Sequence, residues 1–86
     1  MKLSETVTMM NSECYKERFK AEYAQLVIRY KGLCNMLEKC DNGTLAFTPT
    51  CPRSTYDLQT KAMKDYIAVL EARAVMERID LDDLDI

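Results

Sequence analysis

Histidine and tryptophan are absent from these 86 residues, and only two glycines and two prolines occur. Without histidine, neither a Ser–His nor a Cys–His nucleophile system can form, and the common histidine-containing zinc sites are excluded. Gly32 and Gly43 stand alone, so there is no glycine-rich loop to hold a phosphate. These absences predict a protein that is not an enzyme and that uses neither a metal nor a cofactor.

No strong excess of either charge is present. The net charge is −2, from 12 basic and 14 acidic residues, whereas a general nucleic-acid binder carries a strongly basic surface. Four of the acidic residues are concentrated near the end of the sequence, at Asp80, Asp82, Asp83 and Asp85. We therefore expect a nearly neutral body, an acidic tail over residues 80–86 and no general binding of nucleic acids.

Long apolar runs are also missing. No run approaches the roughly 20 residues that span a bilayer, and the first residues lack the apolar segment of a secretory signal. These features predict a cytoplasmic protein that does not enter a membrane. In that reducing compartment, Cys14, Cys34, Cys40 and Cys51 should be free thiols. Because Cys40 and Cys51 flank the same short loop, a bridge between these two is the alternative.

Two stretches of nearly equal length, residues 13–40 and 52–79, have apolar residues at helical spacing. In the first stretch the steps alternate between four and three, as in the seam of a left-handed helix pair. The seam positions are Phe19, Tyr23, Leu26, Tyr30, Leu33, Leu37 and Cys40. Equal arms joined by one loop, residues 41–51, predict a single all-α domain: an antiparallel two-helix hairpin with a short N-terminal arm or helix over residues 1–11.

Local signals add detail to this hairpin. Asn11 or Ser12 is predicted to cap the first helix. Lys61 is expected to pair with Asp57, one turn earlier on the second helix. Phe47, an apolar residue in the loop, is expected to fold back over the open end of the hairpin.

A single partner helix cannot cover every apolar position. Both helices carry additional apolar stripes, and a monomer would leave residues partly wet, such as Val27, Ile28, Val69, Val75 or Met76. Self-association through helix faces would cover them, so we expect a homo-oligomer, either a dimer or a larger helical bundle. The alternative is a kinked hairpin covered by its own N-terminal arm.

The residues best suited to binding combine aromatic rings with cations, which stack on a base and hold a phosphate. A seam between subunits could bring such side chains together. The candidates are Tyr15, Arg18, Tyr30, Lys31, Tyr66 and Arg73. The tyrosines at seam positions equally suit a core from which only the hydroxyl reaches water. The acidic tail is a second candidate, either as a partner contact or as a solubilising segment.

Several residues also carry a family resemblance. They are Arg18, Glu22 and Leu26, then Cys51-Pro52, then Gln59, Met63, Tyr66, Leu70-Glu71, Arg73-Ala74, Glu77 and Ile79-Asp80-Leu81. This pattern resembles the crAss-phage-related family of short phage and prophage helical hairpin proteins. The resemblance implies a phage-encoded accessory protein that acts in the cytoplasm of its bacterial host.

Small phage accessory proteins of this sort commonly counter host defence, which is an argument from analogy. The leading hypothesis is a non-enzymatic protein that binds a host protein and so interferes with a defence or regulatory system. The first alternative is an oligomeric sponge that sequesters a cyclic nucleotide signal. The second is a structural or assembly protein of the phage.

Overall fold

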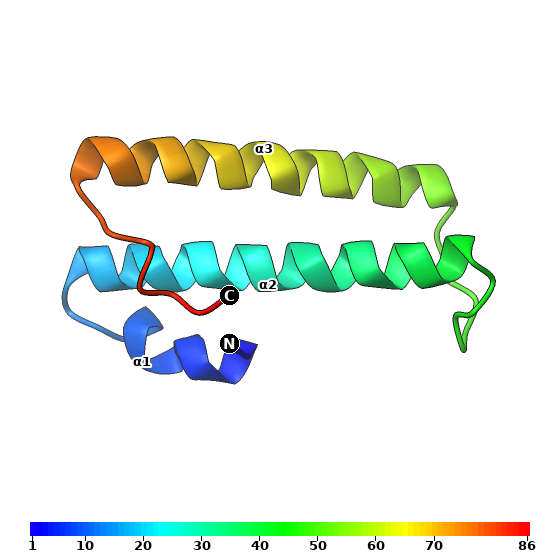
Figure 1. Cartoon of the computed structure of the whole chain (residues 1–86), viewed down its shortest axis with the longest axis horizontal. Coiled ribbons are helices and arrows are strands. Elements are labelled where there is room, and N and C mark those ends of the chain that lie inside the picture. Colours follow the sequence, from blue (N-terminus) through cyan, green and yellow to red (C-terminus); the bar gives the residue numbers. More distant parts are fainter.

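The computed structural model describes residues 1–86 and contains helices and no strands (Figure 1). A 3-10 helix, Leu3–Thr6, leads into the single turn α1, Val7–Met10. The two long helices are α2, Tyr15–Asp41, and α3, Arg53–Glu77. They lie side by side and antiparallel, while the N-terminal arm runs along the first half of α2 (Figure 1). The predicted all-α hairpin with a short N-terminal helix is confirmed.

The ends of α2 follow from local hydrogen bonding. The Ser12 hydroxyl accepts a hydrogen bond from the Cys14 N–H at 3.1 Å, which closes a short turn in front of the helix. Cys14, without a side-chain cap, is therefore the N-cap of α2, and the prediction that Asn11 or Ser12 occupies this position is wrong. At the other end Gly43 has a φ of 72°, the left-handed conformation that commonly ends a helix.

An arginine joins the two long helices at the loop end. The Arg53 guanidinium donates to both carboxylate oxygens of Asp41 at 3.0 Å and to Asp57 at 2.5 Å. Lys61 pairs with Asp65 at 2.9 Å. The predicted Lys61–Asp57 pair is therefore wrong, because Arg53 reaches Asp57 from the preceding turn and leaves Lys61 to the carboxylate that follows it.

The loop leaves its apolar residues largely in water. Phe47 is 58% exposed, so the prediction that it folds back over the open end of the hairpin is wrong. The Arg53 contacts hold this end together instead, and Leu37 is the buried residue next to it. All four cysteines are free thiols, although Cys40 and Cys51 line the same small hollow.

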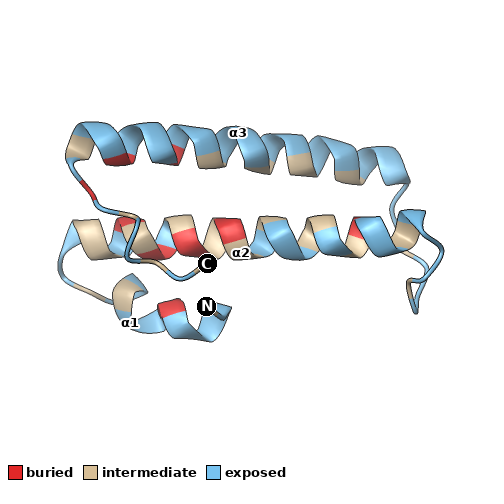
Figure 2. Cartoon of the chain, in the orientation of Figure 1, coloured by how far each residue is buried: buried red, intermediate tan, exposed pale blue.

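The hydrophobic core lies at the opposite end of the hairpin (Figure 2). Only 9 of the 86 residues are buried, which leaves a single chain with a small core for its length. The central cluster is formed by Phe19, Leu70, Ala74 and Ile79. Tyr23, Leu26 and Leu81 pack against this cluster.

The N-terminal arm covers part of the additional apolar stripe of α2. Thr6 is 1% exposed, and its hydroxyl accepts a hydrogen bond from the Gln25 amide at 2.9 Å. Ala24 and Val27 are buried on the same helix. Val69, Val75 and Met76 on α3 remain exposed. The arm therefore protects α2, while the outer side of α3 stays open to water.

Replacing Leu70 with alanine should lower the free energy of unfolding by about 2–5 kcal/mol, because this fully buried side chain would leave a cavity in the central cluster. Urea unfolding followed by circular dichroism measures the loss. Val75→Ala is the control, because Val75 is 80% exposed and its loss should cost less than about 0.5 kcal/mol. Equal losses in the two variants would contradict this placement of the core.

Acid should weaken the loop end of the hairpin. The hydrogen bonds from Arg53 lower the pKa of Asp41 below its ordinary value of 3.8. A carboxyl group with a lowered pKa stabilises the fold above its unfolded pKa, and this stability is lost as pH falls through the folded pKa. We therefore expect stability to fall below pH 3.8, and Asp41→Asn to lose this part of the acid dependence.

Urea unfolding at a series of acidic pH values measures the effect. Asp65→Asn is the matched control, because Asp65 pairs with Lys61 within α3 and does not join the two helices. The control should keep the acid dependence of the unchanged chain. An unchanged chain that loses no more stability below pH 3.8 than Asp41→Asn would show that the Arg53–Asp41 contact does not stabilise the fold.

Candidate functional site

The structure offers two surfaces that suit binding, on the two opposite edges of the hairpin. No group of three His, Cys, Asp or Glu side chains is arranged to hold a metal ion. No helix combines the length and the apolar character needed to cross a membrane. The candidate binding groups are the polar and aromatic side chains on these two edges.

The first edge is built by contacts between α2 and α3. The Tyr66 hydroxyl donates a hydrogen bond to the Glu22 carboxylate. The Arg73 guanidinium lies 4.9 Å from the centre of the Phe19 ring, a cation–π contact, and donates to Glu77 at 2.8 Å. These contacts fix Tyr66 and Arg73 at the same edge of the groove between the helices.

Two more predicted binding residues lie on this edge. Tyr15, 49% exposed, is one helical turn before Phe19 and so shares its face of α2. Arg18 is exposed, and its guanidinium donates to the main-chain oxygen of Ser12 at 2.8 Å. We call Tyr15, Arg18, Tyr66 and Arg73 the aromatic edge. It presents two rings and two guanidinium groups to solvent.

A single chain does not enclose this edge. Three hollows occur on the surface, and none is lined by a residue of the aromatic edge. An open line of rings and cations contacts a ligand from one side only. A second surface is therefore needed to bury a small ligand there, since ligand pockets enclose most of the surface of what they bind.

An apolar stripe runs along α3 beside the aromatic edge. Leu58, Val69 and Met76 are 72%, 56% and 73% exposed. Together with Ala62 they follow steps of four and seven residues, the spacing of a coiled-coil seam. At about 100° per residue, this α3 stripe falls next to Tyr66 and Arg73 on the outer side of the helix. Apolar groups and potential ligand contacts thus share one continuous surface.

The remaining two predicted binding residues lie away from the aromatic edge. Tyr30 is half-buried, and a hydrogen bond with the Cys34 thiol raises the pKa of its hydroxyl. Lys31 donates from its ammonium group to the main-chain oxygen of Ile86 at 2.9 Å. The structure therefore brings four of the six predicted residues to one edge. A binding role for any of them stays a prediction.

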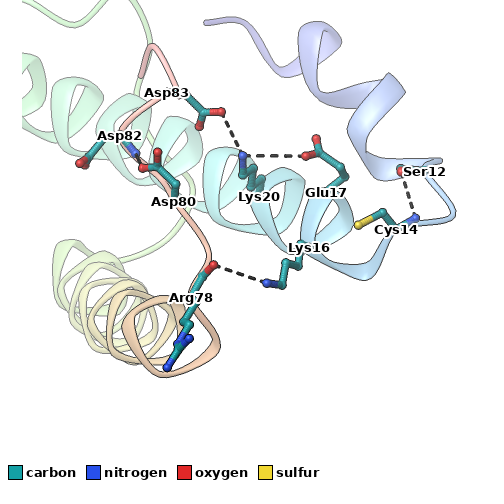
Figure 3. Close-up of polar contacts among 9 residues, drawn as sticks. All are labelled: Ser12, Cys14, Lys16, Glu17, Lys20, Arg78, Asp80, Asp82 and Asp83. Carbon is teal, nitrogen blue, oxygen red and sulfur yellow. Dashed lines mark hydrogen bonds and ion pairs between the residues drawn. The ribbon is translucent and has the colours of Figure 1, made fainter.

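The second edge of the hairpin is covered by the acidic tail (Figure 3). Lys20 forms an ion pair with Asp83 at 3.0 Å and lies 3.8 Å from Glu17. The Lys16 ammonium group contacts the main-chain oxygen of Arg78 at 3.5 Å. The hydrogen bond with Asp83 is the largest cause that raises the pKa of Lys20, against the opposing effect of burial.

The carboxylates of the tail differ in their contacts. Asp83 is paired with Lys20, and the Asp80 carboxylate accepts a hydrogen bond from the Asp82 N–H at 2.9 Å. The Asp82 and Asp85 side chains are exposed. That these carboxylates contact a partner stays a prediction, but one of them is engaged within its own chain.

Lys16 and Lys20 are binding candidates that the sequence analysis missed. With Lys31 they fall within about 60° of one another around α2. We call these three residues the lysine stripe. Its spacing, and the presence of an aspartate-rich segment to pair with it, were both visible in the sequence. Only the folded chain shows that the two meet.

These features describe a small helical protein with exposed groups that suit binding. The family model described as Sequestin matches residues 13–76, about three quarters of the chain. The chain therefore belongs to the Sequestin family, whose name indicates a sequestering, binding role. No curated protein and no solved structure matches it. The expected phage origin stays a prediction.

The matched region contains all four residues of the aromatic edge and all four of the α3 stripe. It ends at residue 76, so the acidic tail lies beyond it. The two edges of the hairpin therefore differ in how far the family match covers them. One lies wholly within the part that the chain shares with its family, and the other depends on a segment outside that part.

Proposed function

We propose that this protein sequesters a small anionic nucleotide, of the class of cyclic nucleotide signals, without converting it. The Sequestin match is the observation that carries the proposal, because it indicates a sequestering role. It favours the sponge over the leading hypothesis from the sequence, in which the protein binds a host protein.

The aromatic edge supplies the chemistry that such a ligand requires. The planar guanidinium groups of Arg18 and Arg73 suit bidentate hydrogen bonding to phosphate oxygens. The rings of Tyr15 and Tyr66 suit stacking against a base, which does not depend strongly on which base is present. A sequestering protein needs affinity and slow release, and neither requires a catalytic group.

The proposed site is completed by a second copy of the chain. Packing of another hairpin along the α3 stripe would cover Leu58, Val69 and Met76 and would place a second wall beside the aromatic edge. The small core of one chain supports this arrangement, because oligomerisation commonly stabilises domains of limited burial. Closed symmetry would repeat the same site at each equivalent seam.

In this proposal the protein is phage-encoded and acts in the cytoplasm of its bacterial host. Binding a signal as a stoichiometric sink would silence a defence pathway without contact with the pathway's own proteins. The resemblance of the second helix to phage hairpin proteins supports this setting.

A second candidate function is binding of a host protein. The exposed side chains Leu58, Val69 and Met76 favour it, because large exposed apolar groups in a row mark protein interaction sites. The oligomeric state discriminates between the two candidates. If copies of the chain bury the α3 stripe against one another, that surface is not free to bind a host protein.

Introducing a charge into the α3 stripe should break the oligomer. We expect light scattering to show a multiple of the 10.0 kDa chain mass for the unchanged protein and a shift towards that single mass for Val69→Glu. Ala68→Glu is the matched control. It adds the same charge one residue earlier, about 100° away around α3, and should leave the mass unchanged. A single mass of 10.0 kDa at every concentration would contradict the seam site.

A ligand that binds the folded protein should raise its thermal midpoint. At a concentration about 100 times its Kd, a cyclic nucleotide would add about 2.7 kcal/mol of stability. For a domain of this size, that corresponds to a rise of about 10–20 °C. Differential scanning fluorimetry with cyclic mono-, di- and trinucleotides makes the measurement.

Arg18→Gln should reduce this rise, because it removes a guanidinium group from the aromatic edge. Lys64→Gln is the matched control, since it removes one positive charge from the opposite side of α3 and should keep the full rise. A panel in which no nucleotide moves the midpoint would remove the proposed ligand class. The protein-binding candidate would then take its place.

A further inference from the structure

The acidic tail follows α2 in the same direction as the helix. Arg78 contacts Lys16, Asp83 contacts Lys20, and the last residue, Ile86, contacts Lys31. The contacts therefore advance together along the tail and along the helix. Figure 1 shows the tail leaving the end of α3, crossing α2 and ending beside it.

The length of the tail matches the lysine stripe. Lys16 and Lys31 are 15 residues apart on α2, which is about 22 Å at a rise of about 1.5 Å per residue. Arg78 and Ile86 are 8 residues apart and can span at most about 28 Å when extended. The tail reaches all three lysines although residues 82 and 83 form a turn, in which the Leu84 N–H donates to the main-chain oxygen of Leu81 at 3.2 Å. Each lysine then meets an oxygen of the tail.

The first part of the tail is anchored by apolar packing. Arg78 adopts a left-handed conformation, with a φ of 57°, which turns the chain back towards α2. Ile79 is 6% exposed in the central cluster, and Leu81 packs against it. Beyond Leu81 no residue is buried, and the polar contacts come from Lys20, from Lys31 and from the Met1 amino group, which donates to the main-chain oxygen of Asp85 at 2.8 Å. The lysine stripe and the N-terminal amino group therefore both hold residues 82–86.

Among the oxygens of the tail that contact the lysine stripe, only that of Asp83 belongs to a charged side-chain carboxylate. The Asp83 carboxylate offers Lys20 the same acceptor chemistry that a phosphate oxygen offers, at an ordinary charge-assisted distance of 3.0 Å. Ion pairs with exposed partners are weak and screened by salt, so they exchange readily for a competing anion. The Asp83 side chain is 59% exposed and that of Lys20 is 14% exposed, so a competing anion reaches the pair from the side of the aspartate.

We propose that the lysine stripe is a phosphate-binding site and that residues 82–86 are its displaceable internal occupant. A phosphate-bearing anion would take the place of Asp83 on Lys20, while Ile79 and Leu81 keep the start of the tail in place. This inference goes beyond the proposed function, because it concerns the opposite edge of the hairpin and requires neither oligomerisation nor the aromatic edge.

Acetylation of lysines, mapped residue by residue with mass spectrometry, tests the proposal on the full chain. In Asp83→Asn, Lys20 should be acetylated about 2- to 5-fold faster than in the unchanged protein, because its internal partner is neutral. Asp82→Asn changes the net charge equally, but Asp82 makes no ion pair with Lys20. It should leave the rate at Lys20 unchanged. Equal rates in the two variants would overturn the proposal.

Inorganic pyrophosphate then serves as the probe anion. It should slow acetylation of Lys20 in Asp83→Asn back towards the rate in the unchanged protein. Adenosine diphosphate is the second probe, and it distinguishes a preference for a nucleotide from binding of phosphate alone. Failure of both probes to protect Lys20 would overturn the phosphate site. A negative result with the cyclic nucleotides does not affect this test, because the two sites lie on different edges.

A measurement on the unchanged chain removes any dependence on how the variants fold. Raising sodium chloride to about 0.5 M should screen the Asp83–Lys20 pair and speed acetylation of Lys20. Lys64, which is exposed on α3 and makes no ion pair, is the internal reference and should keep its rate. A salt response that is the same at Lys20 and Lys64 would show that the tail does not mask the stripe.

Discussion

The packing of Phe19 against Leu70 between the two long helices is the contact on which the rest of the molecule depends. It belongs to the cluster that also holds Ala74 and Ile79, and so it joins α2, α3 and the start of the tail. Arg73 lies over the same Phe19 ring, so the aromatic edge takes its position from this cluster. Both candidate binding surfaces are therefore set by one small core.

The hairpin was predictable from sequence because its period and its single loop leave few other ways to bury apolar residues. Individual contacts were predicted wrongly where a neighbouring residue formed a different local hydrogen bond or ion pair. Ser12 closes a turn in place of a cap, and Arg53 takes Asp57 from the preceding turn. Phe47 stays in water, and the ion pairs of Arg53 join the helices at the loop end without it.

The two candidate sites were predictable to different degrees. The residue types of the aromatic edge were visible, but their grouping depends on the antiparallel register that sets Tyr66 against Glu22. The docking of the tail could not be read from the sequence. It requires a left-handed turn that glycine usually signals, and here Arg78 adopts it. Without that turn, the chain would not be directed back towards the lysines of α2.

The uneven placement of the core gives the hairpin one firm end and one soft end. Near Leu70, opening the helices would expose apolar side chains from three segments at once. Near Arg53 it would break solvent-exposed ion pairs and uncover Leu37. Local opening is governed by such differences in burial. The amide hydrogens around the loop should therefore exchange with solvent long before those around the cluster, so the rod frays from one tip while the other stays closed.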